Sequence, residues 1–246
     1  MIETFAKKLE DVKDLPEKVV KEAVFGSQFH TICSGGAYLN PDYIELFERF
    51  GIQILQGYGM TECSPVISTN VAWNVKKNSV GQLLPNCEAK TVDGELWVRG
   101  SSVMQGYYKM PEETKTALKD GWLCTGDLGY VDEDRFIYLT GRKKNLIITK
   151  NGENVSPEEL ENKLSSSRLV QEVLVREAKG VIEAEIYPDE EYAKKQGLER
   201  EEEVRVELQK LIDEYNQGAP AYKKIYSLII REKEFEKTAS RKIKRY

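Results

Sequence analysis

A strand–helix–strand pattern over residues 29–55 constrains the fold more than any other stretch of this sequence. Phe29–Cys33 and Ile52–Leu55 read as two strands, and between them Asn40 can cap a helix that has Pro41 at its first position. One face of this helix is apolar: Tyr43, Leu46, Phe47 and Phe50. Such a unit requires parallel strands joined by a right-handed crossover. The loops that follow the two strands are therefore expected at one edge of an α/β sheet, where ligands bind.

Both of these loops contain glycine. The first contains Gly36-Ala37, and the second is the segment Gln56-Gly57-Tyr58-Gly59-Met60-Thr61-Glu62, which we expect to form one turn. Glycines let a backbone approach a ligand closely, while Tyr58 supplies a flat ring, Thr61 a hydroxyl and Glu62 a carboxylate. These groups suit a nucleotide with Mg²⁺, which takes one or two carboxylates plus phosphate oxygens. A tight loop after a strand is the alternative interpretation.

Composition narrows the class of protein. The chain has 246 residues, of which 40% are apolar, so it can form one large domain or two ordinary ones. Its formal net charge of -5 does not favour a nucleic-acid partner. No apolar run approaches the ~20 residues that cross a bilayer, and residues 1–10 read as an amphipathic helix rather than a signal peptide. The cysteines form no Cys-x-x-Cys pair, which favours reduced thiols in a cytoplasmic protein.

The pattern changes to short strands and turns over residues 78–140, which predicts a small antiparallel, barrel-like subdomain. Asp93-Gly94 is a hairpin signal within it. Asp127 follows a glycine at a strand end, where its carboxylate can accept hydrogen bonds from both hydroxyls of a ribose. An aspartate that caps a turn is the alternative interpretation at this position.

A basic break at residues 141–145 precedes a second, small α+β domain. A helix is expected to begin at Pro157, a second helix near residues 200–216, and strands near residues 170–176, 180–187 and 226–231. Ser156 and Glu159 predict a capping box, with Pro157 at the first helical position. The predicted organisation is α/β: a partial large domain over residues 1–142, made of the parallel unit and the barrel-like subdomain, and a small mobile domain over residues 143–246.

Several stretches together resemble the adenylate-forming superfamily of acyl-CoA synthetases, luciferases and peptide-synthetase adenylation domains. They occur in the family's order: Ser34–Ala37, Gly57–Glu62, Gly94–Leu96 with Gly106–Tyr108, Thr125–Asp127, Gly141–Lys144, Asn154–Glu159 and Lys237–Lys242. The later stretches are most similar to those of long-chain fatty-acyl-CoA ligases. The resemblance implies an enzyme that joins a carboxylic acid to AMP, releases pyrophosphate and passes the acyl group to coenzyme A. ATP or AMP, Mg²⁺ and coenzyme A are the implied ligands.

The resemblance also implies residue roles. Glu62 would hold magnesium, Thr61 would bind phosphate, and Lys242 would bridge carboxylate and phosphate oxygens during adenylation. The implied nucleotide and coenzyme contacts are Gly36, Ala37, Gly57, Tyr58 (stacked on adenine), Gly59, Asp127 (on the ribose), Arg142 and, for the pantetheine passage, Gly152. Lys144 would be the hinge of the small domain. A solvated tail cation at Lys242 and an ordinary linker at Lys144 are the alternatives that charge alone leaves open.

One family feature is not found in this sequence: a Ser/Thr/Gly-rich phosphate loop that ends in lysine. We therefore expect the chain to be the carboxyl-terminal part of a synthetase, with little turnover alone. An open strand edge beside residues 29–33 and 52–55 is expected to favour self-association. An adenylation domain that loads a carrier protein, and a non-catalytic nucleotide-binding fragment, remain the alternative functions.

Overall fold

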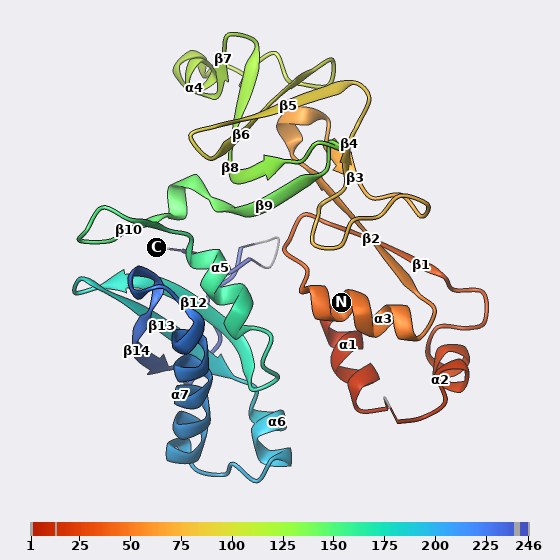
Figure 1. The fold of residues 1–246 in the computed structure, drawn as a ribbon, viewed down its shortest axis with the longest axis vertical. Coiled ribbons are helices and arrows are strands. Elements are labelled where there is room, and N and C mark those ends of the chain that lie inside the picture. Colours follow the sequence, from red (N-terminus) through yellow and green to blue (C-terminus); the bar gives the residue numbers. More distant parts are fainter. Residues whose placement is uncertain (1, 13, 239–241, 246) are drawn as a thin grey trace. The chain divides into compact units, whose positions relative to one another are not determined.

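The structure is a computed structural model that describes residues 2–12, 14–238 and 242–245. It divides into two compact units, residues 1–143 and 144–246, which are described separately here with the labels of Figure 1. In the part of the chain that is described, no helix has the length and apolar character needed to cross a membrane. The mixed α/β class expected from the sequence is confirmed.

The first unit begins with two helices and a parallel strand pair. Its first elements are α1 (Ile2–Glu10), α2 (Glu17–Val24), β1 (Thr31–Gly35), α3 (Pro41–Arg49) and β2 (Gln53–Gly59). β1 and β2 pair in parallel on either side of α3, as predicted. Asn40 caps α3, because its Oδ1 accepts the backbone N–H of Asp42 at 2.9 Å. Phe47 and Phe50 of the predicted apolar face are buried against α1 and α2.

The glycine segment after Ile52 is strand rather than turn, which corrects the sequence interpretation. β2 continues to Gly59 and pairs antiparallel with β3 (Val66–Thr69), and the turn comes later, at the 3-10 helix η1 (Thr61–Cys63). The physical reason is close strand approach: a Cβ on Gly59 would lie 2.1 Å from the carbonyl oxygen of Pro65. Gly59 therefore lets two strands approach each other closely. The sequence pattern instead predicted that this glycine lies in a loop that faces a ligand.

An antiparallel sheet follows, as expected for residues 78–140. β4 (Gln82–Leu83) pairs with β3 and completes the first sheet. The strands of the second sheet are β5 (Cys87–Val92), β6 (Glu95–Gly100), β7 (Leu118–Lys119), β8 (Trp122–Val131) and β9 (Ile137–Arg142). β5, β6, β8 and β7 are neighbours in that order, and β9 pairs with β8. Asp93 and Gly94 both have positive φ, 50° and 80°, in the β5–β6 hairpin, so the predicted turn is confirmed. Helix α4 (Pro111–Ala117) was not expected.

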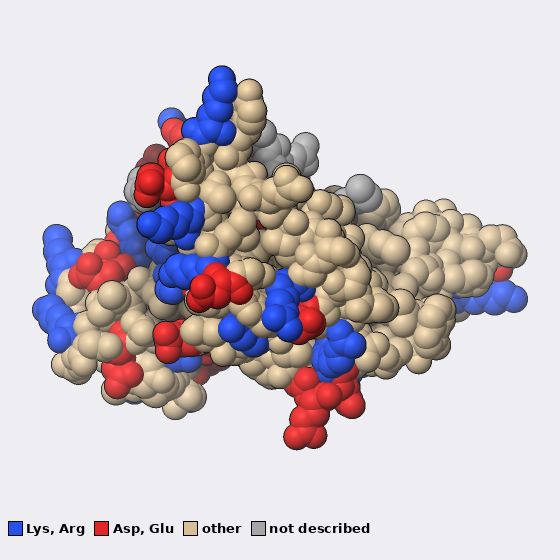
Figure 2. All heavy atoms as spheres, turned by 90° about the horizontal axis from the view of Figure 1, so that it is seen from above, with Lys and Arg blue, Asp and Glu red and all other residues tan. Residues whose placement is uncertain are grey.

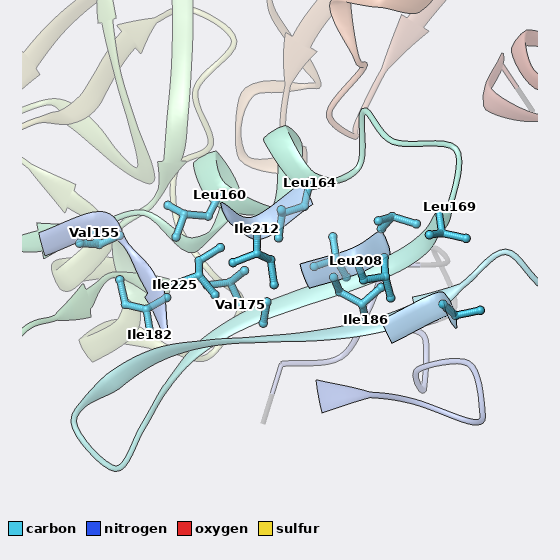
Figure 3. Packing of buried hydrophobic residues seen from close by; sticks show 14 of the residues in the cluster. Val155, Leu160, Leu164, Leu169, Val175, Ile182, Ile186, Leu208, Ile212 and Ile225 are labelled. Carbon is cyan, nitrogen blue, oxygen red and sulfur yellow. The ribbon is translucent and has the colours of Figure 1, made fainter. Parts of the chain in front are cut away.

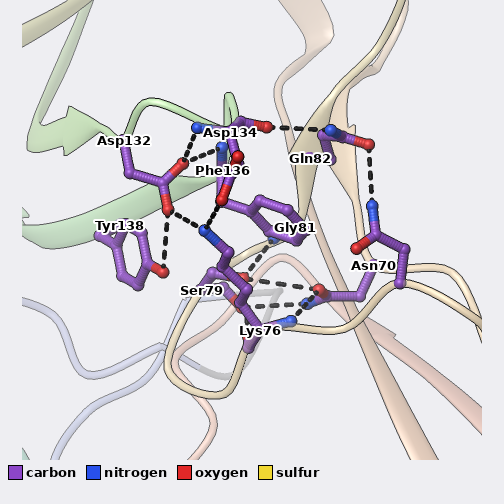
Figure 4. A network of polar contacts seen from close by, with 10 residues as sticks. Asn70, Lys76, Ser79, Gly81, Gln82, Asp132, Asp134, Phe136 and Tyr138 are labelled. Carbon is purple, nitrogen blue, oxygen red and sulfur yellow. Dashed lines mark hydrogen bonds and ion pairs between the residues drawn. The ribbon is translucent and has the colours of Figure 1, made fainter.

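A polar network ties the loop after β3 to the turn between β8 and β9 (Figure 4). Lys76 Nζ donates to Asp132 Oδ2 and Asp134 Oδ2, each at 2.6 Å. Asp132 Oδ1 in turn accepts the backbone N–H groups of Asp134 and Phe136, at 3.0 and 2.8 Å. Backbone hydrogen bonds join residues 80–83 to residues 135–137 beside this network. The two sheets of the first unit are thus held together at this point.

The second unit is a three-stranded sheet with helices. Its elements are η2 (Lys143–Asn145, shared with the boundary), β10 (Ile147–Ile148), β11 (Asn154–Val155), α5 (Pro157–Leu164), β12 (Val170–Ala178), β13 (Val181–Pro188), α6 (Glu190–Lys195), α7 (Glu201–Gly218), η3 (Ala221–Lys223) and β14 (Ile225–Ile230). β13 lies between antiparallel β12 and parallel β14. Figure 3 shows Leu160 and Leu164 of α5 and Leu208 and Ile212 of α7 packed on this sheet. The expected strands and the long helix are confirmed.

The predicted capping box at α5 is wrong. Ser156 occupies the N-cap, but its hydroxyl donates to Glu158 Oε2 at 2.9 Å and makes no cap hydrogen bond. Glu159 instead accepts Lys223 Nζ at 2.7 Å. Pro157 does stand at the first turn of the helix, where a missing N–H costs nothing. The spacing of Ser156 and Glu159 fits a capping box, but Ser156 bonds to Glu158 nearby and Glu159 bonds to Lys223, 64 positions away.

Charges of both signs are distributed over the surface. On the face drawn in Figure 2, Lys and Arg side chains are interspersed with Asp and Glu among uncharged residues. Ion pairs on the surface of α7, such as Lys210 with Glu207 at 2.7 Å, follow the i, i+3 spacing of neighbouring helix turns. Such exposed pairs contribute little to stability, about 0.2–1 kcal/mol each. Stability must therefore come mainly from the buried clusters.

The core of the second unit gives a direct test. Leu208→Ala removes a fully buried side chain from α7 and should lower the free energy of unfolding by about 3 kcal/mol, because it leaves a cavity. Val206→Ala, in the same helix but 53% exposed, is the matched control and should change it by less than about 0.5 kcal/mol. Urea unfolding followed by circular dichroism measures both. Equal losses in the two variants would contradict the described packing of α7.

Candidate functional site

The ends of β1 and β2 bring the two glycine segments side by side in the first unit. Gly35 is the register partner of Gly57, and a Cβ on Gly35 would lie 3.1 Å from the Gly57 carbonyl oxygen. The chain then leaves β1 through Gly36, whose φ is 81°, and Ala37, which is exposed. The expectation that these segments share one sheet edge is therefore met by the strand register.

Tyr58, Asp127 and Arg142 form the centre of the candidate site. The hydroxyl of Tyr58 donates to Asp127 Oδ2 at 2.5 Å, although the two residues are 69 positions apart. Arg142 Nε lies 2.7 Å from Asp127 Oδ1. Asp127 is 3% exposed and Tyr58 is 8% exposed. A buried carboxylate needs charged or hydrogen-bonding partners, and here one partner comes from β2 and the other from β9.

Burial and the neighbouring carboxylate also keep the Tyr58 phenol protonated. Removal from water raises the pKa of Tyr58 most, and the charge of Asp127 and the hydrogen bond to it raise the pKa further. The phenol is therefore a fixed hydrogen-bond donor at every physiological pH. Its predicted stacking on adenine stays a prediction, since the hydroxyl contact concerns only the end of the ring.

The backbone around Asp127 is fixed by Thr125. The Thr125 hydroxyl donates to the Leu96 carbonyl oxygen at 2.7 Å and accepts the backbone N–H of Asp127 at 3.1 Å. Asp127 and Arg142 are also direct register partners in the β8–β9 pair. The carboxylate thus stands on a strand that is bonded on both sides. Functional groups held in this way keep their geometry better than groups on a free loop.

Glu62 lies in η1, directly after β2, next to Thr61. Tyr107 donates its hydroxyl to Glu62 Oε1 at 2.9 Å, and the backbone N–H of Met104 donates to the Glu62 carbonyl oxygen at 2.8 Å. The described residues contain no cluster of three or more His, Cys, Asp or Glu side chains that could hold a metal. Glu62 therefore fits Mg²⁺ only as a single carboxylate that is completed by phosphate oxygens and water, which is the usual coordination of that ion.

Glu95 is a second buried carboxylate beside the site that the sequence did not indicate. Glu95 Oε2 lies 2.8 Å from Lys143 Nζ, and Oε1 accepts the backbone N–H of Gly126 at 2.9 Å. Burial alone raises the pKa of Glu95, but the hydrogen bonds from Lys143 and Gly126 outweigh it and hold the pKa below its ordinary 4.5. Glu95 thus fixes Gly126, the residue that precedes Asp127.

The other three predicted residues belong to the second unit. Lys144 lies in η2 and is exposed. Gly152, with φ of 81°, lies in the turn between β10 and β11, and the adjacent residues Thr149–Asn151 line an open hollow of ≈ 560 Å³. Lys242 is exposed, and its backbone exchanges hydrogen bonds with Thr238. Residues 239–241 of the basic tail lie outside the described part of the chain.

Sequence reasoning missed three residues that support the site. Thr125 and Tyr107 stood within quoted stretches, but no local pattern joins Tyr107 to Glu62, which lies 45 positions away. Glu95 also stood within a quoted stretch, but no local pattern joins it to its partner Lys143, which lies 48 positions away. Each contact is made by tertiary packing. A charged residue that sequence places next to a hairpin turn is ordinarily exposed, whereas Glu95 is 5% exposed.

Two protein families match this chain. The family described as AMP-binding enzyme matches residues 2–108, and the family described as AMP-binding enzyme C-terminal domain matches residues 144–246. The long-chain-fatty-acid–CoA ligase FadD15 of Mycobacterium bovis is 40% identical over 171 residues, which are 69% of this chain and 28% of that protein. The long-chain-fatty-acid–CoA ligase of Bacillus subtilis is 38% identical over 163 residues, 61% of this chain and 29% of that protein. The aligned region thus spans under a third of these relatives.

Solved structures match over more of the chain. The o-succinylbenzoate CoA synthetase of Bacillus subtilis, in complex with an acyl-adenylate intermediate, has a TM-score of 0.76 and 27% identity, and the match covers 96% of this chain and 48% of that one. The adenylation domain of a carboxylate reductase from Mycobacterium chelonae has a TM-score of 0.80 and covers 98% of this chain and 42% of that one. At 22% identity, the second likeness concerns the fold alone.

The Glu95–Lys143 contact predicts a pH-dependent stability. Lys143→Met leaves a buried carboxylate short of a donor and should lower the free energy of unfolding by about 1–2 kcal/mol at pH 7. Because the folded-state pKa of Glu95 is depressed, its contribution is complete above about pH 4.5 and is lost as pH falls through the folded value. The difference from wild type should therefore shrink below about pH 4.

Urea unfolding at a series of pH values measures this difference. Lys144→Met removes the neighbouring exposed lysine and serves as the control, with little change expected at any pH. A loss in Lys143→Met that persists undiminished at pH 3 would contradict the assignment to ionised Glu95.

Proposed function

Because the chain belongs to the family of AMP-binding enzymes, we propose that it carries the adenylate cradle of an AMP-forming acid:CoA ligase that acts on fatty acids. The main supporting observation is the buried carboxylate of Asp127, which is contacted by Tyr58 from one strand and by Arg142 from another. The fatty-acid substrate is supported by the relatives that are named long-chain-fatty-acid–CoA ligases. The activity proposed is that of the whole enzyme to which this chain corresponds.

The reaction has two steps in which bonds and charges balance. In the first, a carboxylate oxygen of the acid attacks the α-phosphorus of ATP, the bond to the β-phosphate oxygen breaks, and pyrophosphate leaves. In the second, the thiol of coenzyme A loses its proton to solvent, its sulfur bonds to the acyl carbon, and AMP leaves with the former carboxylate oxygen. The first step joins two anions, so the protein must bring positive charge and hydrogen-bond donors to the transition state.

Asp127 is proposed to accept hydrogen bonds from the two ribose hydroxyls. An ionised carboxylate accepts hydrogen bonds on both of its oxygens. The contacts of Tyr58 with Oδ2 and of Arg142 with Oδ1 hold the Asp127 carboxylate in a fixed orientation for the ribose. The guanidinium of Arg142, 44% exposed, offers its remaining N–H groups toward solvent and the nucleotide. Tyr58 would then present its ring to the adenine.

The turn after β2 is proposed to hold the phosphates. Thr61 offers a hydroxyl and Glu62 a carboxylate at the start of η1, and Gly57 and Gly59 remove side chains from the strand that leads there. The bare loop Gly36-Ala37 beside Gly57 would form the wall next to the base. Bound Mg²⁺ would neutralise phosphate charge, with Glu62 as its protein ligand.

The second unit is proposed to act as the small mobile domain of residues 143–246, with residues 1–142 as part of the large domain. Lys144 would be the hinge, Lys242 would supply the cation for adenylation, and the Gly152 turn would guide the thiol of coenzyme A. Closure of a domain can bring a remote group to one step and withdraw it for the next. An exposed Lys242 on a terminal segment suits such an exchange better than a lysine inside a core.

Nucleotide binding tests the cradle directly in the 246-residue chain. Wild type should bind AMP, and Asp127→Ala should weaken AMP binding by about 10- to 100-fold, because two hydrogen bonds to a charged group are lost. Isothermal titration calorimetry measures both affinities, and circular dichroism checks folding. Asp127→Asn, which keeps the shape of the side chain, should also weaken binding.

Glu133→Ala is the matched control for this experiment, since Glu133 is exposed in the neighbouring β8–β9 turn. It should bind AMP like wild type. Absence of AMP binding by wild type would refute the cradle, and equal affinity in Asp127→Ala would refute the role of the carboxylate. AMP binding is also expected of an adenylation domain that loads a carrier protein. The experiment therefore tests the cradle whichever molecule accepts the acyl group.

Lys242 is tested by separating the two half-reactions in a full-length synthetase that carries this chain. Lys242→Ala should lower acyl-adenylate formation by at least about 100-fold, since one charge-assisted contact in the transition state contributes about 2.7–4 kcal/mol. Thioester formation from supplied acyl-adenylate should be unaffected. Pyrophosphate release and thioester production report the two steps. Lys244→Ala is the control in the same tail, and equal loss of both steps in Lys242→Ala would contradict the exchange.

A further inference from the structure

Glu62 is held at two points by one segment of the first unit. The backbone N–H of Met104 donates to the Glu62 carbonyl oxygen at 2.8 Å, and the hydroxyl of Tyr107 donates to Glu62 Oε1 at 2.9 Å. Among the residues that the structure describes, Tyr107 is the side chain that contacts this carboxylate by a hydrogen bond. Position and orientation of the carboxylate therefore both depend on residues 104–107.

Tyr107 is itself fixed by helix α4. Its backbone N–H donates to Thr114 Oγ1 at 2.9 Å, and the Thr114 hydroxyl donates onward to the Met110 carbonyl oxygen at 2.7 Å. Gly106 makes this contact possible, since its φ is 153° and a Cβ there would lie 2.7 Å from Thr114 Cγ2. The chain thus passes Thr114 at a distance that only glycine permits. The hydroxyl of Tyr107 is presented from an anchored backbone.

The neighbouring tyrosine has a different environment. Tyr108 is 86% exposed, whereas Tyr107 is 36% exposed. The ring of Tyr108 contacts the Lys109 ammonium at 5.3 Å from its centroid, a contact on the surface of the same loop. The two adjacent tyrosines therefore have the same chemistry, but only one of them contacts Glu62. This difference separates a role of the hydroxyl from a general effect of aromatic residues in the loop.

We propose that Tyr107 is a positioning residue for the magnesium-binding carboxylate of Glu62, anchored by Thr114. Its hydrogen bond to Oε1 fixes the plane of the carboxylate and leaves Oε2 to face the cation of a Mg²⁺–nucleotide. This inference rests on the proposed function, because it assigns to Glu62 the metal named there. The hydroxyl acts through Glu62 and does not itself touch nucleotide or metal.

The physical basis is the loss of freedom on binding. A lone glutamate ligand on a surface turn must lose side-chain rotation when it binds a cation, which costs conformational entropy. A hydrogen bond that already holds the carboxylate removes much of this cost before the metal arrives. Partners that orient metal ligands in this way typically change metal affinity by about 10- to 100-fold when they are mutated. With one protein carboxylate in the site, the effect on Mg²⁺ should be clear.

Calorimetry on the 246-residue chain tests the proposal without catalytic turnover. Affinity is measured for AMP without metal, for ATP with EDTA and for ATP with Mg²⁺. The ratio of the last two affinities is the metal increment. Tyr107→Phe should reduce the metal increment by about 10-fold and leave AMP affinity within about twofold of wild type. Glu62→Gln should remove the increment, and Tyr108→Phe, the matched control, should change neither quantity.

Substitutions at Thr114 provide an independent test of the proposal. Thr114→Val keeps the shape but removes the oxygen that binds the Tyr107 backbone, so it should also lower the metal increment, whereas Thr114→Ser keeps the hydroxyl and should restore it. An unchanged increment in Tyr107→Phe, or a wild type that binds AMP but shows no metal increment, would overturn the proposal while the adenylate cradle stands. Failure of wild type to bind AMP would remove the proposed function and this inference with it.

Discussion

The buried carboxylate of Asp127 is the constraint on which the first unit depends. At 3% exposure, an ionised carboxylate is stable only if nearby donors replace the water that it has lost. Two of its donors are Tyr58 on β2 and Arg142 on β9, so the carboxylate is contacted from both sheets of the unit. This contact joins the two sheets, as the network around Lys76 does elsewhere, and it also fixes a carboxylate and a guanidinium beside each other.

Strand geometry explains why so much bare backbone lies beside this carboxylate. Gly57 and Gly59 are in β2, which lies close to β3. A Cβ on Gly59 would lie only 2.1 Å from the Pro65 carbonyl oxygen, and one on Gly57 would lie 3.3 Å from that of Ser68. The glycines therefore serve the pairing of β2 with β3. Tyr58, which lies between them, is 8% exposed and directs its hydroxyl to Asp127. Gly106 is a second position of this kind, because its close approach to Thr114 places Tyr107 beside Glu62.

Local sequence signals predicted the helix cap and the hairpin turn. The length of β2 and the contacts of the site depend largely on partners that are distant in the sequence. The cap at Asn40 and the Asp93-Gly94 hairpin were predicted because each is encoded within a few residues. β2 was predicted too short, since glycines read as turn signals and the strand that faces them comes later in the chain. The cap at Ser156 failed for a local reason instead, because the hydroxyl donates to Glu158, two residues along the chain. The candidate residues around Asp127 were predicted from their family resemblance, but the contacts of Glu95 with Lys143 span 48 positions and have no local pattern.

The charge balance of the first unit shows what it needs from elsewhere. Glu62, Glu95 and Asp127 each have a donor in the folded chain, and Lys143 is already committed to Glu95. A nucleoside triphosphate would add several negative charges to this surface, where Arg142, 44% exposed, is the cation in contact with Asp127. Under the proposed function, the remaining positive charge comes from Mg²⁺ and from Lys242 of the second unit. Both are separable from the cradle, so the site can be strongly cationic during adenylation and less so when AMP must leave. A cradle with those cations built in would bind AMP too tightly to release it, which gives a physical reason for carrying the lysine on a unit of its own.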